Sequence, residues 1–206
     1  MSAITSALKS RLTLHLLIAL PGALLAWRWA RVLQGEDPYL AGLTAEPIDA
    51  TINTLGLWAL RALLLTLAIT PLRRHFRWSW LASWRRPLGL WCFAYALSHL
   101  TVYFALDNEG SLALLWQDVL KHRFVFFGMA ALVLIAPLAA TSTKGMIRRL
   151  GGKRWQVLHR LVYPAAILGA VHFIMRVKGF QWEPWLYAAL LAFLLASRLK
   201  RPAYRD

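Results

Sequence analysis

Six long apolar stretches constrain this chain more than any other feature of its sequence. They lie at about 12–30, 53–71, 86–106, 120–140, 155–175 and 182–199, and short polar connections separate them. An α-helix needs about 20 mainly apolar residues to cross the hydrocarbon core of a bilayer, and it satisfies its own backbone hydrogen bonds there. The sequence therefore predicts an all-α integral membrane protein with six transmembrane helices, forming one domain over residues 1–206.

Composition and charge exclude several other classes of protein. The chain is 59% hydrophobic, whereas soluble domains have roughly 45–50% apolar residues. A net charge of +15 is compatible with nucleic-acid binding, but the basic residues lie between the apolar stretches, where they set membrane topology instead. The single cysteine, Cys92, lies inside an apolar stretch, so a disulfide framework and a thiolate cluster are both excluded. Any metal ligands must therefore be histidines.

The basic residues are also distributed unevenly between the two sides of the predicted bundle. Lys and Arg are concentrated before the first stretch, between the second and third, between the fourth and fifth, and after the sixth. Eight of the nine acidic residues lie in the other set of connections. Cytoplasmic loops of bacterial membrane proteins carry the excess of Lys and Arg. We therefore expect cytoplasmic N and C termini and a multi-pass location in the bacterial inner membrane.

Ionisable side chains at membrane depth are costly and usually serve a function. They are candidates here at six positions: His15, Arg61, His99, His159, Arg160 and His172. His75 and His122 fall near the ends of the stretches, where a solvated side chain is the simpler interpretation.

Two of these histidines lie at comparable depths in different helices. His99 is about 13 residues into the third stretch and His172 about 17 into the fifth, at 1.5 Å of rise per residue. Neutral imidazole is a good ligand for iron. The sequence therefore predicts that His99 and His172 bind one haem from opposite faces, although an isolated intramembrane histidine can also hydrogen-bond a neighbouring helix.

His159 suggests a second haem nearer the cytoplasm. It precedes His172 by 13 residues, or about 20 Å along an ideal helix, and the two side chains would lie roughly 140° apart around that helix. Pro164 lies between them and can kink the helix. Position 85, where a partner ligand is needed on the third stretch, is arginine, which is a poor metal ligand but can hold a haem propionate.

Arg61 could bind a propionate of the outer haem in the same way as Arg85 would at the inner one. For both arginines the alternatives are a carboxylate partner in the protein or a side chain that extends to the membrane surface.

Several short segments resemble the MsrQ (YedZ) family, and through it the ferric reductase and NADPH oxidase transmembrane domain. They are Leu88-Gly89-Leu90-Trp91, His99, Thr141-Ser142, Leu150-Gly151, Trp155, Leu158-His159, Tyr163 and His172-Phe173. The resemblance implies a bundle with haem between its third and fifth helices. Related oxidases hold two haems with four histidines, so Arg85 leaves open whether one or two haems are bound.

The resemblance also implies a haem b-binding membrane subunit of a two-part methionine sulfoxide reductase. Such a subunit passes electrons to a periplasmic molybdoprotein, MsrP, which carries out the sulfoxide chemistry. The electrons come from the quinone pool or a cytosolic flavin reductase, and an FMN is associated with the subunit. No segment of this sequence locates the FMN, and no GxGxxG dinucleotide motif follows a strand.

Two other functions fit six apolar helices. A stand-alone ferric-chelate reductase would use the same haem to deliver electrons to external iron. A small transporter or an intramembrane protease would be unrelated to redox chemistry, but the sequence shows neither internal repeats nor a GxSxG motif.

Overall fold

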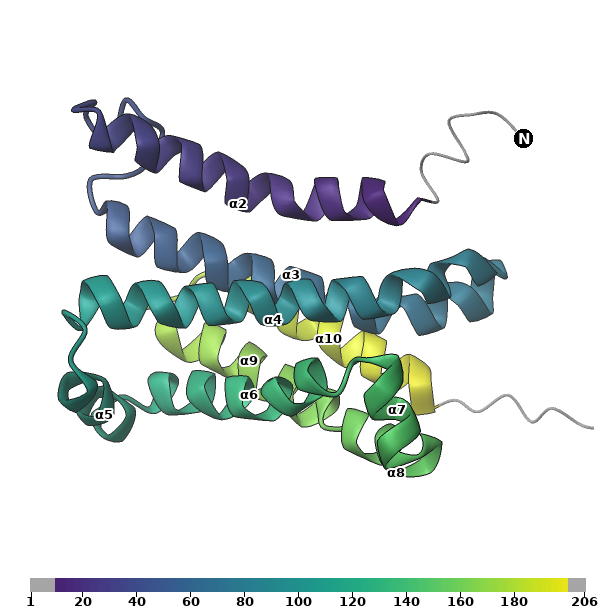
Figure 1. The fold of residues 1–206 in the computed structure, drawn as a ribbon. Helices are drawn as coiled ribbons and strands as arrows, with labels where there is room; N and C mark the ends of the chain where they lie inside the picture. The colour runs from purple at the N-terminus through teal and green to yellow at the C-terminus, as the bar shows by residue number, and fades with distance from the viewer. Residues whose placement is uncertain (1–9, 200–206) are drawn as a thin grey trace, which may run out of the picture.

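The computed structural model describes residues 10–199, and these residues form helices and turns without a strand (Figure 1). The long helices are α2 (Arg11–Leu33), α3 (Pro47–Phe76), α4 (Arg85–Val102), α6 (Arg123–Ala140), α9 (Val162–Arg176) and α10 (Trp182–Leu199). The shorter ones are η1 (Ser79–Trp84), η2 (Tyr103–Asp107), α5 (Leu112–Lys121), α7 (Lys144–Leu150) and α8 (Gly152–His159).

Five segments within residues 10–199 are long and apolar enough to cross a membrane, which confirms the predicted all-α transmembrane fold. They are Arg11–Leu33, Pro47–Phe76, Ser79–Asp107, Arg123–Ala140 and Gly152–Arg176. Helix α10 occupies the sixth predicted stretch but is not among the five. The sixth crossing and the cytoplasmic termini therefore remain predictions.

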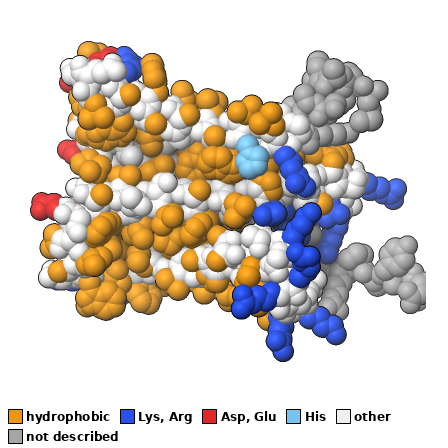
Figure 2. Space-filling view, viewed as in Figure 1, with side chains coloured by type: hydrophobic (Ala, Val, Ile, Leu, Met, Phe, Trp, Pro, Cys, Tyr) orange, Lys and Arg blue, Asp and Glu red, His pale blue; other side chains and the backbone are white. Residues whose placement is uncertain are grey.

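The two ends of the bundle differ in charge, as the sequence pattern indicates. Figure 2 shows most Lys and Arg of one face gathered at the end where α3 passes into α4 and where α7 and α8 lie, with acidic side chains at the opposite end. Apolar side chains cover the surface between the two ends. This arrangement is what a bundle with one cytoplasmic and one external end requires.

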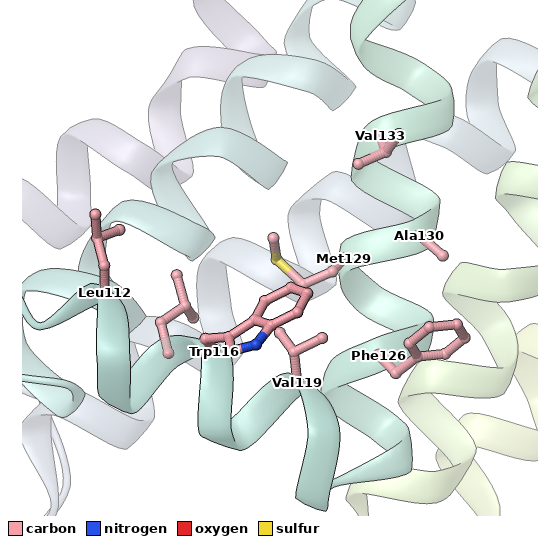
Figure 3. Close-up of a pocket in the computed structure, with 8 residues that line it drawn as sticks. Leu112, Trp116, Val119, Phe126, Met129, Ala130 and Val133 are labelled. Carbon is pink, nitrogen blue, oxygen red and sulfur yellow. The ribbon is translucent and has the colours of Figure 1, made fainter.

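Helix α5 was not predicted, and it shortens the expected helix at 120–140. Its N-terminus is capped by Ser111, whose Oγ accepts a hydrogen bond from the Leu114 N–H at 3.3 Å. Helix α6 consequently begins only at Arg123. Between α5 and α6 lies a groove of about 550 Å³ with an apolar lining that includes Trp116, Phe126 and Met129 (Figure 3).

The predicted helix at 155–175 is interrupted between α8 and α9. Pro164 has no N–H to donate to the carbonyl of Arg160, and that carbonyl instead accepts from the Tyr163 N–H at 3.0 Å. Arg160 and Leu161 form a turn between the two helices. The departure from a straight helix that Pro164 predicts is therefore confirmed.

Helix α2 is joined to the bundle by a hydrogen bond pair deep in the apolar region. The Tyr95 hydroxyl of α4 donates to the Ile18 carbonyl at 2.6 Å and accepts from the Gly22 N–H at 3.2 Å. In a regular helix these two backbone groups would bond to each other. The Tyr95 hydroxyl thus bridges the turn of α2 that contains Pro21. Both a proline and a side chain inserted between backbone groups are recognised causes of helix bending.

We expect Tyr95→Phe to loosen α2 without unfolding the bundle. The change leaves the Ile18 carbonyl and the Gly22 N–H without their shared partner, at a cost of about 1–3 kcal/mol. Hydrogen exchange of α2 around Gly22 should accelerate, and the Tm in detergent should fall. Tyr39→Phe is the matched control because the Tyr39 side chain is 76% exposed. Equal exchange in the two variants would contradict the proposed attachment.

Candidate metal centre

His99 projects from α4 toward α3, where a backbone carbonyl orients its ring. Its Nδ1 lies 2.8 Å from the carbonyl oxygen of Ile52. Because a carbonyl can only accept, Nδ1 must carry the proton in this hydrogen bond. The lone pair of the neutral ring is then on Nε2, where it is available to a metal.

His172 repeats this arrangement on the other pair of helices. Its Nδ1, on α9, lies 2.7 Å from the carbonyl oxygen of Phe124 on α6. The same reasoning places the lone pair of His172 on Nε2. Metal-binding histidines usually donate their second ring N–H to a carbonyl or carboxylate, which fixes the tautomer and the orientation of the ring.

A glycine makes each of these contacts possible. A Cβ at Gly56 of α3 would lie 3.0 Å from His99 Nδ1, and a Cβ at Gly128 of α6 would lie 2.8 Å from His172 Nδ1. Each glycine follows the accepting carbonyl by four residues, one helical turn. Glycine inside a helix costs about 1 kcal/mol relative to alanine, and here it provides the room that the imidazole ring needs.

The two rings are separated by a distance that suits a shared metal. Their centroids are 6.0 Å apart and their planes are inclined at 85°. A metal–imidazole bond is about 2 Å long and Nε2 lies about 1 Å from its ring centre, so two rings binding one metal from opposite sides have centroids roughly 6 Å apart. The structure therefore brings together the two histidines that the sequence predicts as a pair.

Across residues 10–199, no three His, Cys, Asp or Glu side chains gather into a group that could hold a metal ion. The His99–His172 pair thus provides two ligands, which suits a metal that arrives with other ligands of its own. Haem iron, with four macrocycle nitrogens and two axial positions, meets this description.

A cavity of about 650 Å³ surrounds the histidine pair, which is within the usual range of roughly 300–1,000 Å³ for ligand sites. Near the histidines its lining is mostly apolar and includes Leu60, Leu132 and Ile135. Its outer part is polar and includes Asp49, Asn53, Asp107, Asp118, Arg176 and Glu183. The apolar interior suits a flat hydrophobic cofactor, and at the otherwise acidic mouth Arg176 is the group that can pair with a carboxylate at the edge of such a cofactor.

Arg176 is a residue of this site that the sequence did not predict. It follows His172 by four residues on α9, lines the same cavity, and donates a hydrogen bond to Oδ1 of Asn53. The one signal in the sequence is the spacing of four, which places the two side chains on the same helix face.

Arg61, the predicted propionate partner, lies elsewhere. Its Nε donates to the Tyr187 hydroxyl at 2.7 Å, and its guanidinium lies 4.9 Å from the centre of the Trp58 ring. Arg61 is not among the residues that line the cavity around His99 and His172.

His159, the predicted inner ligand, ends α8 and stacks on Trp155 with ring centroids 3.7 Å apart. Its Nδ1 lies 3.0 Å from the Trp155 carbonyl oxygen, while its Nε2 is buried and has no hydrogen-bond partner within residues 10–199.

Two other buried nitrogens, the Trp84 Nε1 and the Arg198 Nε, also have no hydrogen-bond partner among the described residues. Trp84 ends η1, His159 ends α8 and Arg198 lies in the last turn of α10; the start of α4, helix α8 and the end of α10 lie at the same end of the bundle (Figure 1). Arg85 begins α4 at this end and donates to the Thr70 hydroxyl.

Of the remaining histidines, His122 lines the outer part of the cavity, whereas His15 and His75 do not line it. His15 is exposed on α2 and accepts a hydrogen bond from the Trp91 Nε1 at 2.9 Å. His122 lies 3.7 Å from the Asp118 carboxylate, and the His75 ring contacts Phe76 edge-on.

Comparison with known proteins places these features in a family. Residues 55–170 match the family of ferric reductase-like transmembrane components, and this segment includes Gly56, His99 and Gly128. A protein of Rhodospirillum rubrum is 46% identical over 181 residues, covering 88% of this chain and 84% of that protein. A protein of Xanthomonas campestris pv. campestris is 42% identical over 195 residues, covering 94% and 87%.

A third relative, from Brucella anthropi, is 46% identical over 164 residues, covering 80% of this chain and 74% of that protein. All three are named heme-binding subunit MsrQ of protein-methionine-sulfoxide reductase. The family resemblance that the sequence suggests is therefore confirmed, and this chain belongs to the MsrQ family of ferric reductase-like transmembrane proteins.

Proposed function

We propose that this chain is the haem b-binding electron-transfer subunit of a methionine sulfoxide reductase system in the bacterial inner membrane. It passes electrons to an MsrP-like periplasmic molybdoprotein, which reduces methionine sulfoxide in periplasmic proteins. The observation that supports this proposal most directly is the pair His99 and His172, whose rings are 6.0 Å apart and whose Nε2 atoms are both left free by their Nδ1 hydrogen bonds. The relatives, which are named heme-binding subunits, support the same cofactor.

The protein's contribution to this chemistry is to hold and tune the iron, which supplies one-electron transfer when bound. The carbonyls of Ile52 and Phe124 fix both imidazoles in the tautomer that leaves Nε2 free. A hydrogen bond from Nδ1 also raises the basicity of the ligand nitrogen. The apolar lining near the histidines would limit the access of water to a bound iron, so that His99 and His172 would hold it.

An inner haem at His159 would extend the route toward the cytoplasm. The buried Nε2 of His159, which has no partner within the described part of the chain, supports a ligand role. Arg85, at the same end of the bundle, would hold a propionate. By the family resemblance, electrons would arrive from the quinone pool or a cytosolic flavin reductase, with an FMN at a position still to be assigned.

Six crossings with both termini in the cytoplasm would place the His99–His172 site toward the periplasm. The charge difference between the two ends of the bundle supports this orientation (Figure 2). A single domain over residues 1–206 is part of the same proposal.

Histidine substitutions test the site directly. We expect His99→Ala or His172→Ala to abolish the low-spin spectrum of bis-histidine haem, since each removes one axial ligand. His159→Ala should remove at most a second haem, and His15→Ala, on the exposed side of α2, should change nothing. Visible spectra and haem-to-protein ratios of the purified variants provide the measurement, and unchanged spectra for His99→Ala and His172→Ala would refute the site.

The glycine contacts give an independent test. A methyl group at position 128 would lie 2.8 Å from His172 Nδ1, so we expect Gly128→Ala to displace the imidazole and reduce low-spin haem content severalfold. Gly89→Ala is the matched control, because a Cβ at Gly89 of α4 meets no atom within 4 Å. Equal haem content in both variants would show that Gly128 does not position His172.

The electron acceptor separates the proposal from a stand-alone ferric-chelate reductase. We expect the reduced protein in detergent to be reoxidised by purified MsrP much faster than by ferric citrate at equal concentration. Stopped-flow absorbance of the haem provides the rates. Rapid oxidation by ferric citrate with no response to MsrP would support the ferric reductase instead.

A further inference from the structure

Arg176 is a charged side chain inside the outer part of the cavity. It is half-buried, and its guanidinium donates to the side-chain carbonyl of Asn53, a neutral acceptor. The ion pairs found in residues 10–199 are Arg31–Glu36 and His122–Asp118, so Arg176 takes part in none of them. Desolvating a guanidinium without an anion is costly. The location of Arg176 therefore calls for an anionic partner, and residues 10–199 place none within ion-pair distance.

The position of Arg176 defines where that partner must lie. It is one turn beyond His172 on α9, about 6 Å further toward the outer end. A guanidinium has five N–H donors in a planar fork, which matches the two oxygens of a carboxylate. Asn53 occupies part of this fork, and the rest can face the cavity.

Helix α3 couples this arginine to the histidine pair through adjacent residues. The Ile52 carbonyl accepts from His99, and the Asn53 side chain accepts from Arg176. Neighbouring residues of α3 thus orient both His99 and Arg176. Arg176 in turn lies one helical turn beyond His172 on α9.

We infer that Arg176, oriented by Asn53, binds a carboxylate of the cofactor whose iron lies between His99 and His172. The inference rests on the proposed function. It gives Arg176 the role that the sequence suggested for Arg61, whose guanidinium is engaged by Tyr187 and Trp58 outside the cavity. Asp49, on the same cavity mouth, is the competing anion within the protein.

Arg176 also affects the reduction potential. A positive charge near the iron stabilises the reduced state, which carries one positive charge fewer than the oxidised state. Asp49, Asp107 and Asp118 line the same mouth and act in the opposite direction. Removing the Arg176 charge leaves these carboxylates unopposed and lowers the midpoint potential.

The test uses the full chain purified in detergent with its haem. For Arg176→Gln we expect an unchanged low-spin spectrum, a lower midpoint potential in a potentiometric titration at fixed pH, and haem loss to excess apomyoglobin at least about tenfold faster. Arg176→Lys, which keeps the charge, should recover most of the potential but not the slow haem loss. Arg61→Gln is the matched control and should behave as the wild type.

Asn53→Ala provides a second variant if Arg176→Gln does not accumulate. It retains the charge but frees the guanidinium, so haem loss should accelerate while the potential stays near that of the wild type. Wild-type rates of haem loss and wild-type potentials in both Arg176→Gln and Asn53→Ala would overturn the inference, as would a lowered potential in Arg61→Gln alone.

Asp49→Asn should raise the potential without accelerating haem loss. Faster haem loss in this variant would identify Asp49 as the anion that orients Arg176 and would overturn the inference. A wild-type protein without haem absorbance would instead refute the proposed function itself.

Discussion

The candidate haem site depends on a hydrogen bond from an imidazole Nδ1 to a backbone carbonyl, formed twice. In the α3–α4 pair it joins His99 to Ile52, and in the α6–α9 pair it joins His172 to Phe124. Each bond requires a glycine one turn later, because a Cβ there would lie 3.0 Å or less from the same nitrogen. Within each pair the two helices must approach closely at the glycine, and the two rings positioned in this way have centroids 6.0 Å apart. The close packing of each helix pair and the orientation of its candidate haem ligand therefore depend on the same contact between glycine and histidine.

Much of this fold follows from the sequence because its dominant signals are local. Apolar length predicts the spanning helices, and Pro164 predicts the break before α9. The predicted pairing of His99 with His172 rests on their comparable depths in two helices that run in the same direction, and on the suitability of imidazole as an iron ligand. Helix α5 was not predicted because its ten residues are too few to span a membrane, so most of it falls in the connection between the third and fourth apolar stretches.

The features that sequence could not supply depend on contacts between helices. Gly56 and Gly128 look like ordinary small residues of apolar stretches, and only the facing imidazoles show their purpose. Arg61 lies in the middle of α3 and Arg176 at the outer end of α9, and the packing of these helices directs one side chain to Tyr187 and the other into the cavity. Depth can be read from a single sequence, whereas the direction in which a side chain points depends on how the neighbouring helix packs.

The break between α8 and α9 bears on the inner site as well. An ideal helix would place His159 and His172 roughly 140° apart, which argues against a shared electron path on one face. The structure removes that restriction, because α8 ends at His159 and α9 begins at Val162 after a turn. The orientation of His159 is then set by its stacking on Trp155 and by the packing of α8, not by the register of α9. Among the described residues the buried Nε2 of His159 has no hydrogen-bond partner, while its Nδ1 bonds the Trp155 carbonyl. His159 therefore shows the same division of its two ring nitrogens as His99 and His172.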